Sequence, residues 1–450
     1  MLANAREHSV TPAKHDSDGT KACKTIEPTL SESADVHAVK AYEEWIAELL
    51  KQQRFEDLDC VANSARVGKL RFPGGAWKLH SIYAGLAEPE PGKHATEEDW
   101  KNHFTVLEHW VAARPDSITA RVALADSYAE YAWAARGDGY SDTVTDNGWK
   151  LMGERLEKAK SLLDEATTLT TKCPEWYRVM LQIALGQGWE QEQESELFHQ
   201  AVASEPDYYY YYQAQALFLL PKWNGEDGDS SKFAEESANR IGGSQGDELY
   251  FRIAQKDVCA CNQPEFNHFS FPRIQHGFEE AEKEYGLSIV DLNTLALMAI
   301  KSSDYIAADE AFKRIGDNWD RDTWRTEAYF NQNKTWATAS APRLRAERNA
   351  LSAEGKQYIA DVERRLAPVL AHCMEEPSRD PAKFHLLIQI AQDGSPEKPG
   401  LIEPGAMSSC VVGELLRARD RHDILFPPPP QPSYWLFVEL DPSAFSATAR

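Results

Sequence analysis

Long hydrophobic runs are missing from this sequence. No stretch of 18 apolar residues occurs, so we expect no helix that crosses a membrane. The N-terminal stretch from Met1 to Lys24 also lacks the apolar segment of a secretory signal peptide. The expected location is therefore the cytoplasm, and the periplasm is the alternative if an export signal has been removed.

Positive charge is scarce. Lys and Arg number 48 against 71 Asp and Glu, and the net charge at pH 7 is −23. A nucleic-acid groove or a surface for anionic lipids needs clustered Lys and Arg, so we expect no nucleic-acid partner and no membrane insertion. An acidic surface is also the ordinary way in which a large protein stays soluble, so the charge by itself names no ligand.

The familiar motifs of catalysis and cofactor binding are absent as well. The sequence has no Walker A motif, no dinucleotide fingerprint and no His-Glu-x-x-His zinc motif. The segment Gly242-Gly-Ser-Gln-Gly246 matches the nucleophile pattern of hydrolases in letters only, because a predicted helix, not a strand, precedes it. We therefore expect no catalytic residue, no cofactor and no enzymatic activity.

A repeating helical pattern is what the sequence does contain. Trp189 and Trp223 are 34 residues apart, and Ala166 and Ala201 are 35 residues apart. A period near 34, with a small residue in the second helix of each pair, is typical of tetratricopeptide helical hairpins. The predicted fold is mainly α, a tetratricopeptide-like α-α superhelix followed by a small α+β C-terminal module.

The composition predicts four parts along the chain. Residues 1–35 are polar and expected to be disordered, and residues 36–330 carry the amphipathic helices of the repeat domain. Residues 331–355 are rich in Ala, Ser, Thr, Asn and Arg, which suggests a linker. Residues 356–450 form the C-terminal module, where apolar residues alternate along two predicted strands, one from Phe384 and one from Tyr434.

Two resemblances rest on particular stretches of the chain. Residues from about 40 to 330 resemble a bacterial family of unknown function built on tetratricopeptide-like repeats. The matching stretches are Phe72-Pro-Gly-Gly-Ala-Trp77, Tyr131-Ala-Trp-Ala-Ala-Arg-Gly137, Gly139-Tyr-Ser-Asp-Thr-Val144, Glu175-Trp176, Ala184-Leu-Gly-Gln-Gly-Trp189 and Leu219-Leu-Pro-Lys-Trp223. This resemblance implies a fold and no activity.

The C-terminal 80 residues resemble the small domains related to TonB C-terminal and gliding-motility-type modules. The residues concerned are Cys373, Asp393-Gly394, Cys410, Phe426-Pro-Pro-Pro and Tyr434-Trp435. This second resemblance implies binding of partner proteins in the cell envelope, although the sequence has no transmembrane anchor and no basic linker.

The most unusual feature is a run of five tyrosines from Tyr208 to Tyr212. Five consecutive residues of a helix point in all directions, so they cannot all enter the core. We expect one subset to pack against Trp189 and Trp223 and the rest to line a groove, since Tyr is frequent in binding surfaces. Packing between repeats with hydroxyls reaching solvent is the alternative. The predicted partner-binding residues, for another protein, are Tyr208, Tyr209, Tyr210, Tyr211, Tyr212, Arg178, Gln182, Gln213 and Gln215.

Two cysteine clusters leave other functions open. Cys259, Cys261, His268 and His276 could supply ligands for zinc, and a metal-dependent protein or enzyme is the competing prediction, although their spacing is not a familiar one. Cys373 and Cys410 lie on apolar faces of predicted helices. They would form a disulfide in an oxidising compartment and would be packed thiols in the cytoplasm. A third hypothesis is a cell-envelope assembly component that acts through the C-terminal module.

Overall fold

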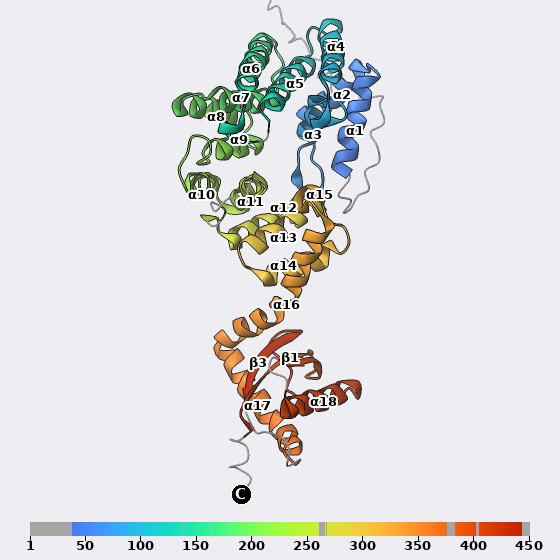
Figure 1. The fold of residues 1–450 in the computed structure, drawn as a ribbon, viewed down its shortest axis with the longest axis vertical. Coiled ribbons are helices and arrows are strands. Elements are labelled where there is room, and N and C mark those ends of the chain that lie inside the picture. Colours follow the sequence, from blue (N-terminus) through green and yellow to red (C-terminus); the bar gives the residue numbers. More distant parts are fainter. Residues whose placement is uncertain are drawn as a thin grey trace, which may run out of the picture. The chain divides into compact units, whose positions relative to one another are not determined.

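The computed structural model describes residues 38–137, 139–260, 266, 268–375, 383–401 and 405–442 (Figure 1). The described chain is mainly helical and carries one three-stranded antiparallel sheet near its C-terminus. This agrees with a mainly α protein that ends in a small α+β module. Within the described residues, no helix combines the length and the apolar composition needed to cross a bilayer. The predicted tail at 1–35 lies outside these residues.

Contacts between residues divide the chain into two compact units. The first unit comprises residues up to 253 together with 279–288, and the second comprises 254–278 together with residues from 289 onward. The division therefore falls within two helices, α11 and α12, and earlier in the chain than the predicted linker. Each unit is described by itself below.

The helices of the first unit follow one another with short connections. They are α1 (Ala38–Lys51), α2 (Phe55–Gly68), α3 (Lys78–Ala87), α4 (Glu97–Ala113), α5 (Ile118–Arg136), α6 (Asp146–Ala166), α7 (Pro174–Gln187), α8 (Gln191–Ser204), α9 (Tyr210–Phe218) and α10 (Asp229–Ile241), with parts of α11 (Gly243–Ala260) and α12 (Phe271–Tyr285). Short 3-10 turns lie at Pro73–Gly75, Gly92–His94 and Ser141–Thr143. The stretch with the 34-residue period contains the consecutive helices α7, α8, α9 and α10, and α7 and α9 begin 36 residues apart, at Pro174 and Tyr210.

Local sequence explains where several of these helices begin and end. Thr96, Ser117 and Thr145 accept a backbone N–H at the starts of α4, α5 and α6, which satisfies donors that a helix leaves unpaired. Pro174 stands at the first position of α7, where its missing N–H costs nothing. The left-handed Gly188 ends the same helix.

Four helices of the first unit form what we call the central layer: α3, α5, α7 and α9. Helix α5 contacts α3 and α7, α7 also contacts α9, and α3 reaches α7 directly. Close approach is possible because α5 buries small side chains, namely Ala120, Ala123, Ala125, Ala129 and Ala132. Helices α4, α6, α8 and α10 pack against members of this layer.

In the second unit, the remaining parts of α11 and α12 are followed by the helices that precede the C-terminal module, α13 (Ile289–Lys301), α14 (Tyr305–Ile315), α15 (Arg321–Trp324) and α16 (Glu327–Leu351). The predicted linker at 331–355 is therefore helical and not an extended connection. Its Ala and Arg are strong helix formers, and Arg345 of α16 pairs with the buried Asp309 of α14 at 2.8 Å. Composition alone does not reveal such anchoring.

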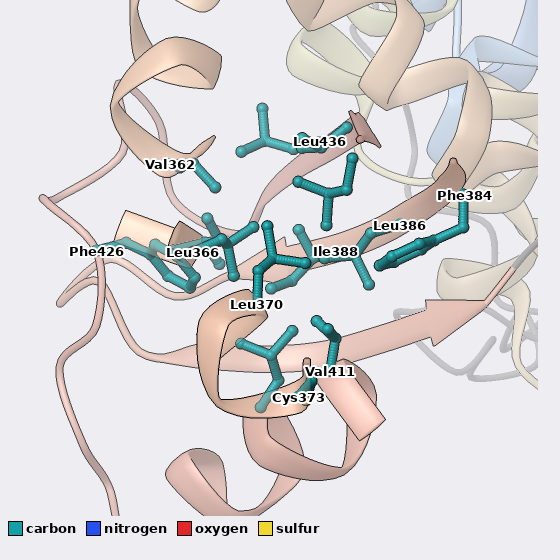
Figure 2. Close-up of a cluster of buried hydrophobic side chains, with 14 of the residues drawn as sticks. Val362, Leu366, Leu370, Cys373, Phe384, Leu386, Ile388, Val411, Phe426 and Leu436 are labelled. Atoms are coloured by element: carbon teal, nitrogen blue, oxygen red, sulfur yellow. The ribbon is translucent and has the colours of Figure 1, made fainter. Parts of the chain in front are cut away.

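The C-terminal module has the element order α17 (Ala353–Cys373), β1 (Phe384–Ile390), β2 (Pro396–Leu401), α18 (Ala406–Asp420) and β3 (Tyr434–Leu440). The strand order is β2-β1-β3, with antiparallel pairing and Leu386 opposite Val438. Apolar residues of the strands face α17 and α18 on one side of the sheet. Figure 2 shows Leu366 and Leu370 of α17 beside Leu386 and Ile388 of β1.

Candidate functional site

The tyrosine run packs inside the first unit. Tyr208 and Tyr211 have no exposed surface, Tyr209 and Tyr212 are buried, and Tyr210 is half-buried. The expectation that several of them line an open groove is therefore wrong for all but Tyr210. Helix α9 begins only at Tyr210, and aromatic residues of other segments pack around the tyrosines that precede it and follow it.

The rings that surround the run are not the ones expected. Tyr208 contacts Trp77 edge-on at 4.8 Å between ring centres, and Tyr210 stacks on His80 at 3.8 Å. Tyr212 contacts Phe198. Trp223, which we expected beside the tyrosines, instead contacts Trp133, at 5.6 Å. Residues far apart in sequence thus supply the packing, and the repeat pattern does not show them.

Beneath the tyrosines, a buried carboxylate meets partners from α3, from its own helix α7 and from the residues just before α9. Glu175 of α7 has no exposed surface, and it accepts hydrogen bonds from the Tyr208 hydroxyl and from Arg178. His80 of α3 lies 2.9 Å from the same carboxylate. Burial by itself raises the pKa of Glu175, but Arg178, His80 and the Tyr208 bond outweigh burial and lower that pKa to about 2. Glu175 is therefore ionised at every physiological pH.

Arg178 extends this cluster across the central layer. It bonds Asp126 of α5, which is 1% exposed, and donates to Gln182 at 3.0 Å. Gln182 in turn donates to Glu130 of α5 at 2.8 Å. These residues form what we call the ionic network: His80, Asp126, Glu130, Glu175, Arg178, Gln182 and Tyr208. One guanidinium thus compensates two buried carboxylates, and a neutral amide connects it to a third.

The two carboxylates of α5 differ from Glu175 in the direction of their pKa shifts. Burial raises the pKa of Asp126 and outweighs the opposing effect of Arg178, and the nearby negative charge of Glu175 acts in the same direction as burial. Burial, with the nearby charge of Asp126, raises the pKa of Glu130 to about 6, although the Gln182 bond and Arg178 act in the opposite direction. Glu130 therefore titrates close to neutrality.

Glu130 also lines a pocket of about 490 Å³ beside the C-terminal half of α5, one helix of the central layer. The wall is formed by α4, α5, α6 and the segment after α3, through the residues Glu88, Gly92, Ala95, Glu97, Trp100, Glu130, Tyr131, Trp133, Ala134, Ala135, Gly137, Leu151 and Arg155. Ligand pockets typically measure about 300–1,000 Å³ and combine aromatic walls with a few polar groups. This pocket has both properties.

One side of the pocket is held together by an internal cation. The Arg155 guanidinium lies 3.1 Å from the centre of the Tyr131 ring and donates to the Tyr131 carbonyl at 2.8 Å. Arg155 also pairs with Glu97 at 3.4 Å, and Glu97 accepts the Tyr131 hydroxyl. The aromatic and acidic residues of this wall therefore already hold one cation.

The remaining predicted binding residues belong to the same layer. Gln213 is half-buried and donates to the Arg252 carbonyl at 2.7 Å, whereas Gln215 is buried beside Glu194 of α8. The structure thus brings Arg178 and Gln182 into the ionic network but leaves Gln215 without access to a ligand. Sequence reasoning missed His80, Asp126 and Glu130; an Asp within the Ala-rich stripe of α5 was the available signal.

The predicted zinc ligands are only partly described. Cys261 and the side chain of Cys259 lie outside the described residues, and His268 and His276 are both exposed. Among the described residues, no group of three or more His, Cys, Asp or Glu is placed to hold a metal ion. The metal hypothesis stays a prediction.

The other cysteine pair is joined. Cys373 at the end of α17 and Cys410 of α18 form a disulfide across 37 residues of sequence, and Cys373 is fully buried. Cys60 is also disulfide-bonded, whereas Cys173 is a buried free thiol. The pairing of Cys373 with Cys410 is one of the two alternatives that the sequence left open, whereas the bond of Cys60 was not predicted.

The edge strand β3 of the C-terminal module is partly covered by the chain itself. Helix α16 packs against β3, and the Asn349 side chain donates to the Trp435 carbonyl at 2.9 Å. Arg343 lies over the Phe437 ring at 5.6 Å. An uncovered edge strand can pair with other chains, so these contacts with α16 restrict access to β3.

Comparisons with known proteins find no similar protein. Protein-family models, curated proteins and solved structures were each compared with the chain, and none of them matches it. Any function must therefore be argued from the geometry of the chain itself.

Proposed function

We propose that the protein is a non-enzymatic scaffold that binds a segment of a partner protein at the central layer. The observation that carries this proposal is the pocket beside the C-terminal half of α5, because its wall residue Glu130 is bonded into the ionic network. Side chains that are held in place before binding lose less entropy when a partner arrives. A tetratricopeptide-like superhelix would place such a surface along a continuous groove.

The residue types at the pocket support protein recognition. Trp100, Tyr131 and Trp133 line it, and aromatic residues are enriched at the centres of protein interfaces. Glu175 and Tyr208 have residue types used in acid–base catalysis, but both are fully buried and bond each other. An active site needs polar groups that converge on a space for substrate, and this arrangement favours a positioning role.

Selection of peptides from a random displayed library by the full chain tests the scaffold function. We expect a pool of peptides that bind the protein and are lost when Ala134→Arg fills the pocket. Ala134 is exposed at the pocket wall, so this substitution leaves the core intact. Ala112→Arg on α4 is the matched control, because Ala112 is equally exposed and is not a lining residue. Failure to select any pocket-dependent peptide would contradict the proposal.

A second candidate function concerns the C-terminal module. The disulfide between Cys373 and Cys410 favours an oxidising compartment, and the module resembles envelope domains that bind partner proteins. We propose as the alternative that the protein is a cell-envelope component and resides in the periplasm. Rapid alkylation of thiols in cells of the native host, followed by mass spectrometry, tests this alternative. Recovery of both cysteines in alkylated form would count against it.

A further inference from the structure

The charges that line the pocket are unbalanced. Among its lining residues in the described part of the chain, Glu88, Glu97 and Glu130 carry carboxylates, and Arg155 alone carries a positive charge. Arg155 is already engaged by Glu97 and by the Tyr131 ring. Arg155 is therefore taken up by Glu97 and Tyr131 and forms no ion pair with Glu130 among the described residues.

Glu130 is the carboxylate of the pocket that most needs a cation. Its hydrogen-bond partner is the neutral amide of Gln182, and Asp126 lies one helical turn before it on the same helix. Within the described ranges, no ion pair reaches Glu130, since Arg178 bonds Asp126 and Glu175 instead. A half-buried carboxylate without a positive partner is costly to maintain, and perturbed groups of this kind concentrate at binding sites.

The pocket wall also offers aromatic faces to a cation. Arg155 shows how this wall holds a guanidinium, between the Tyr131 ring and a carboxylate. The indole of Trp100 lines the same space as Glu130, whereas the Trp133 ring already contacts Arg136 at 5.8 Å and Trp223. Indole is the aromatic group that attracts a positive charge most strongly, so the empty part of the pocket matches a second cation next to Glu130.

We propose that this pocket receives an arginine or lysine side chain of the bound protein segment, with its positive group against Glu130. This inference rests on the proposed scaffold function and names the chemistry of the partner. A segment rich in basic residues also suits a protein whose net charge is −23, because opposite charges raise the rate of encounter.

The selected peptides provide the test. We expect Arg and Lys to be enriched in the pool bound by the full chain, and the enrichment to disappear for Glu130→Gln, which keeps a side-chain oxygen for Gln182. One selected peptide is then synthesised with arginine or with its neutral analogue citrulline. Titration calorimetry at neutral pH should show about tenfold weaker binding of the citrulline peptide, because a charge-assisted bond is lost.

The variant and its control separate charge from folding. Glu130→Gln should weaken the arginine peptide about tenfold and leave the citrulline peptide unchanged, whereas Glu154→Gln, on the exposed face of α6, should change neither. Thermal unfolding of all three proteins checks that the fold persists.

Other results of these experiments would separate the cation inference from the scaffold function. A pocket-dependent pool without basic residues, or equal binding of the two peptides, would overturn the cation inference and leave the scaffold function standing. Free arginine amide that binds as tightly as the peptide would show that the pocket takes a small amine, which also overturns the inference. If no peptide is selected, both proposals fall.

Discussion

The central layer of the first unit and the C-terminal module keep their helices in place by different means. The layer buries Asp126 and Glu175 around one arginine, and its helices meet through charges and hydrogen bonds. The module buries aliphatic and aromatic side chains and joins α17 to α18 through a disulfide. Apolar packing tolerates many shapes, whereas an ionic cluster is satisfied in one geometry only. We infer from this difference that the layer holds polar side chains in fixed orientations, whereas the module is organised for stability.

The largest expected effect comes from removing the one cation of the ionic network. Arg178→Met leaves the buried Asp126 without a cation and Glu175 with only His80 and Tyr208 as partners, and we expect the free energy of unfolding of the first unit to fall by about 3–5 kcal/mol. Urea unfolding, with hydrogen exchange read on α7, measures the loss. Arg121→Met is the control, because Arg121 pairs with the exposed Glu165 at 3.6 Å and should cost less than about 1 kcal/mol. Equal losses in the two variants would contradict a special role of the network.

The stability of the C-terminal module should depend on its disulfide about as strongly as the stability of the first unit depends on Arg178. Replacing Cys373 and Cys410 by Ala removes a bond that spans 37 residues, and we expect the module to lose about 3–4 kcal/mol of stability, since the unfolded chain gains conformational freedom. Hydrogen exchange of β1 amides measures the effect, and exchange of α7 should stay unchanged. Slower or unchanged exchange in β1 would show that the apolar core alone holds the module.

A third comparison concerns a carboxylate of α8 that lies outside the ionic network and is also buried. Glu194 is 1% exposed, and burial raises its pKa from the ordinary 4.5 to about 7 despite a hydrogen bond from Gln215. The folded state therefore binds this proton more tightly than the unfolded state. Its contribution to stability is full below pH 4.5 and is lost as the pH rises through about 7.

Glu194→Gln should remove this pH dependence. We expect the variant to be more stable than the parent by about 3 kcal/mol at pH 8 and nearly equal at pH 5, as measured by urea unfolding at the two pH values. A glutamine can also donate to the Gln215 side-chain oxygen, which has no partner among the described residues. Glu192→Gln, at an exposed position of α8, should show no difference from the parent. A destabilised Gln variant at pH 8 would contradict the argument.

The smallest expected effect is on the local stability of β3, the edge strand of the C-terminal module that α16 covers. Asn349→Ala removes the bond to the Trp435 carbonyl, which is worth about 1 kcal/mol. Hydrogen exchange of β3 should become about fivefold faster, since about 1 kcal/mol corresponds to that factor in local opening. Asn331→Ala, at an exposed position of the same helix, is the control. Unchanged exchange in β3 would show that α16 gives the strand no protection.

Sequence patterns predicted helices and strands better than they predicted the contacts between them. The alternation from Phe384 and from Tyr434 predicted β1 and β3 because period-two patterns depend on neighbouring residues alone. The linker at 331–355 was misread, since the contacts that hold α16 to α14 involve residues about 36 positions away. The amino-acid composition of a segment does not reveal contacts with residues so far away in the sequence.

None of the predicted partner-binding residues lines the proposed pocket. Arg178 and Gln182 were among the expected binding residues, and both belong to the ionic network. The pocket itself was missed, because Glu88, Trp100 and Glu130 come from different segments of the chain and none of them forms a motif. The tyrosine run, the most visible feature of the sequence, proved to be largely core.

Sequence by itself therefore determined the helical character, the 34-residue spacing and the two alternating strands, because periodicity and capping act over a few residues. Tertiary structure alone decided which charges meet. Asp126 faces Arg178 only because the small residues of α5 let α7 approach closely. The bond between Gln182 and Glu130 likewise joins residues 52 positions apart, and no local pattern encodes that distance.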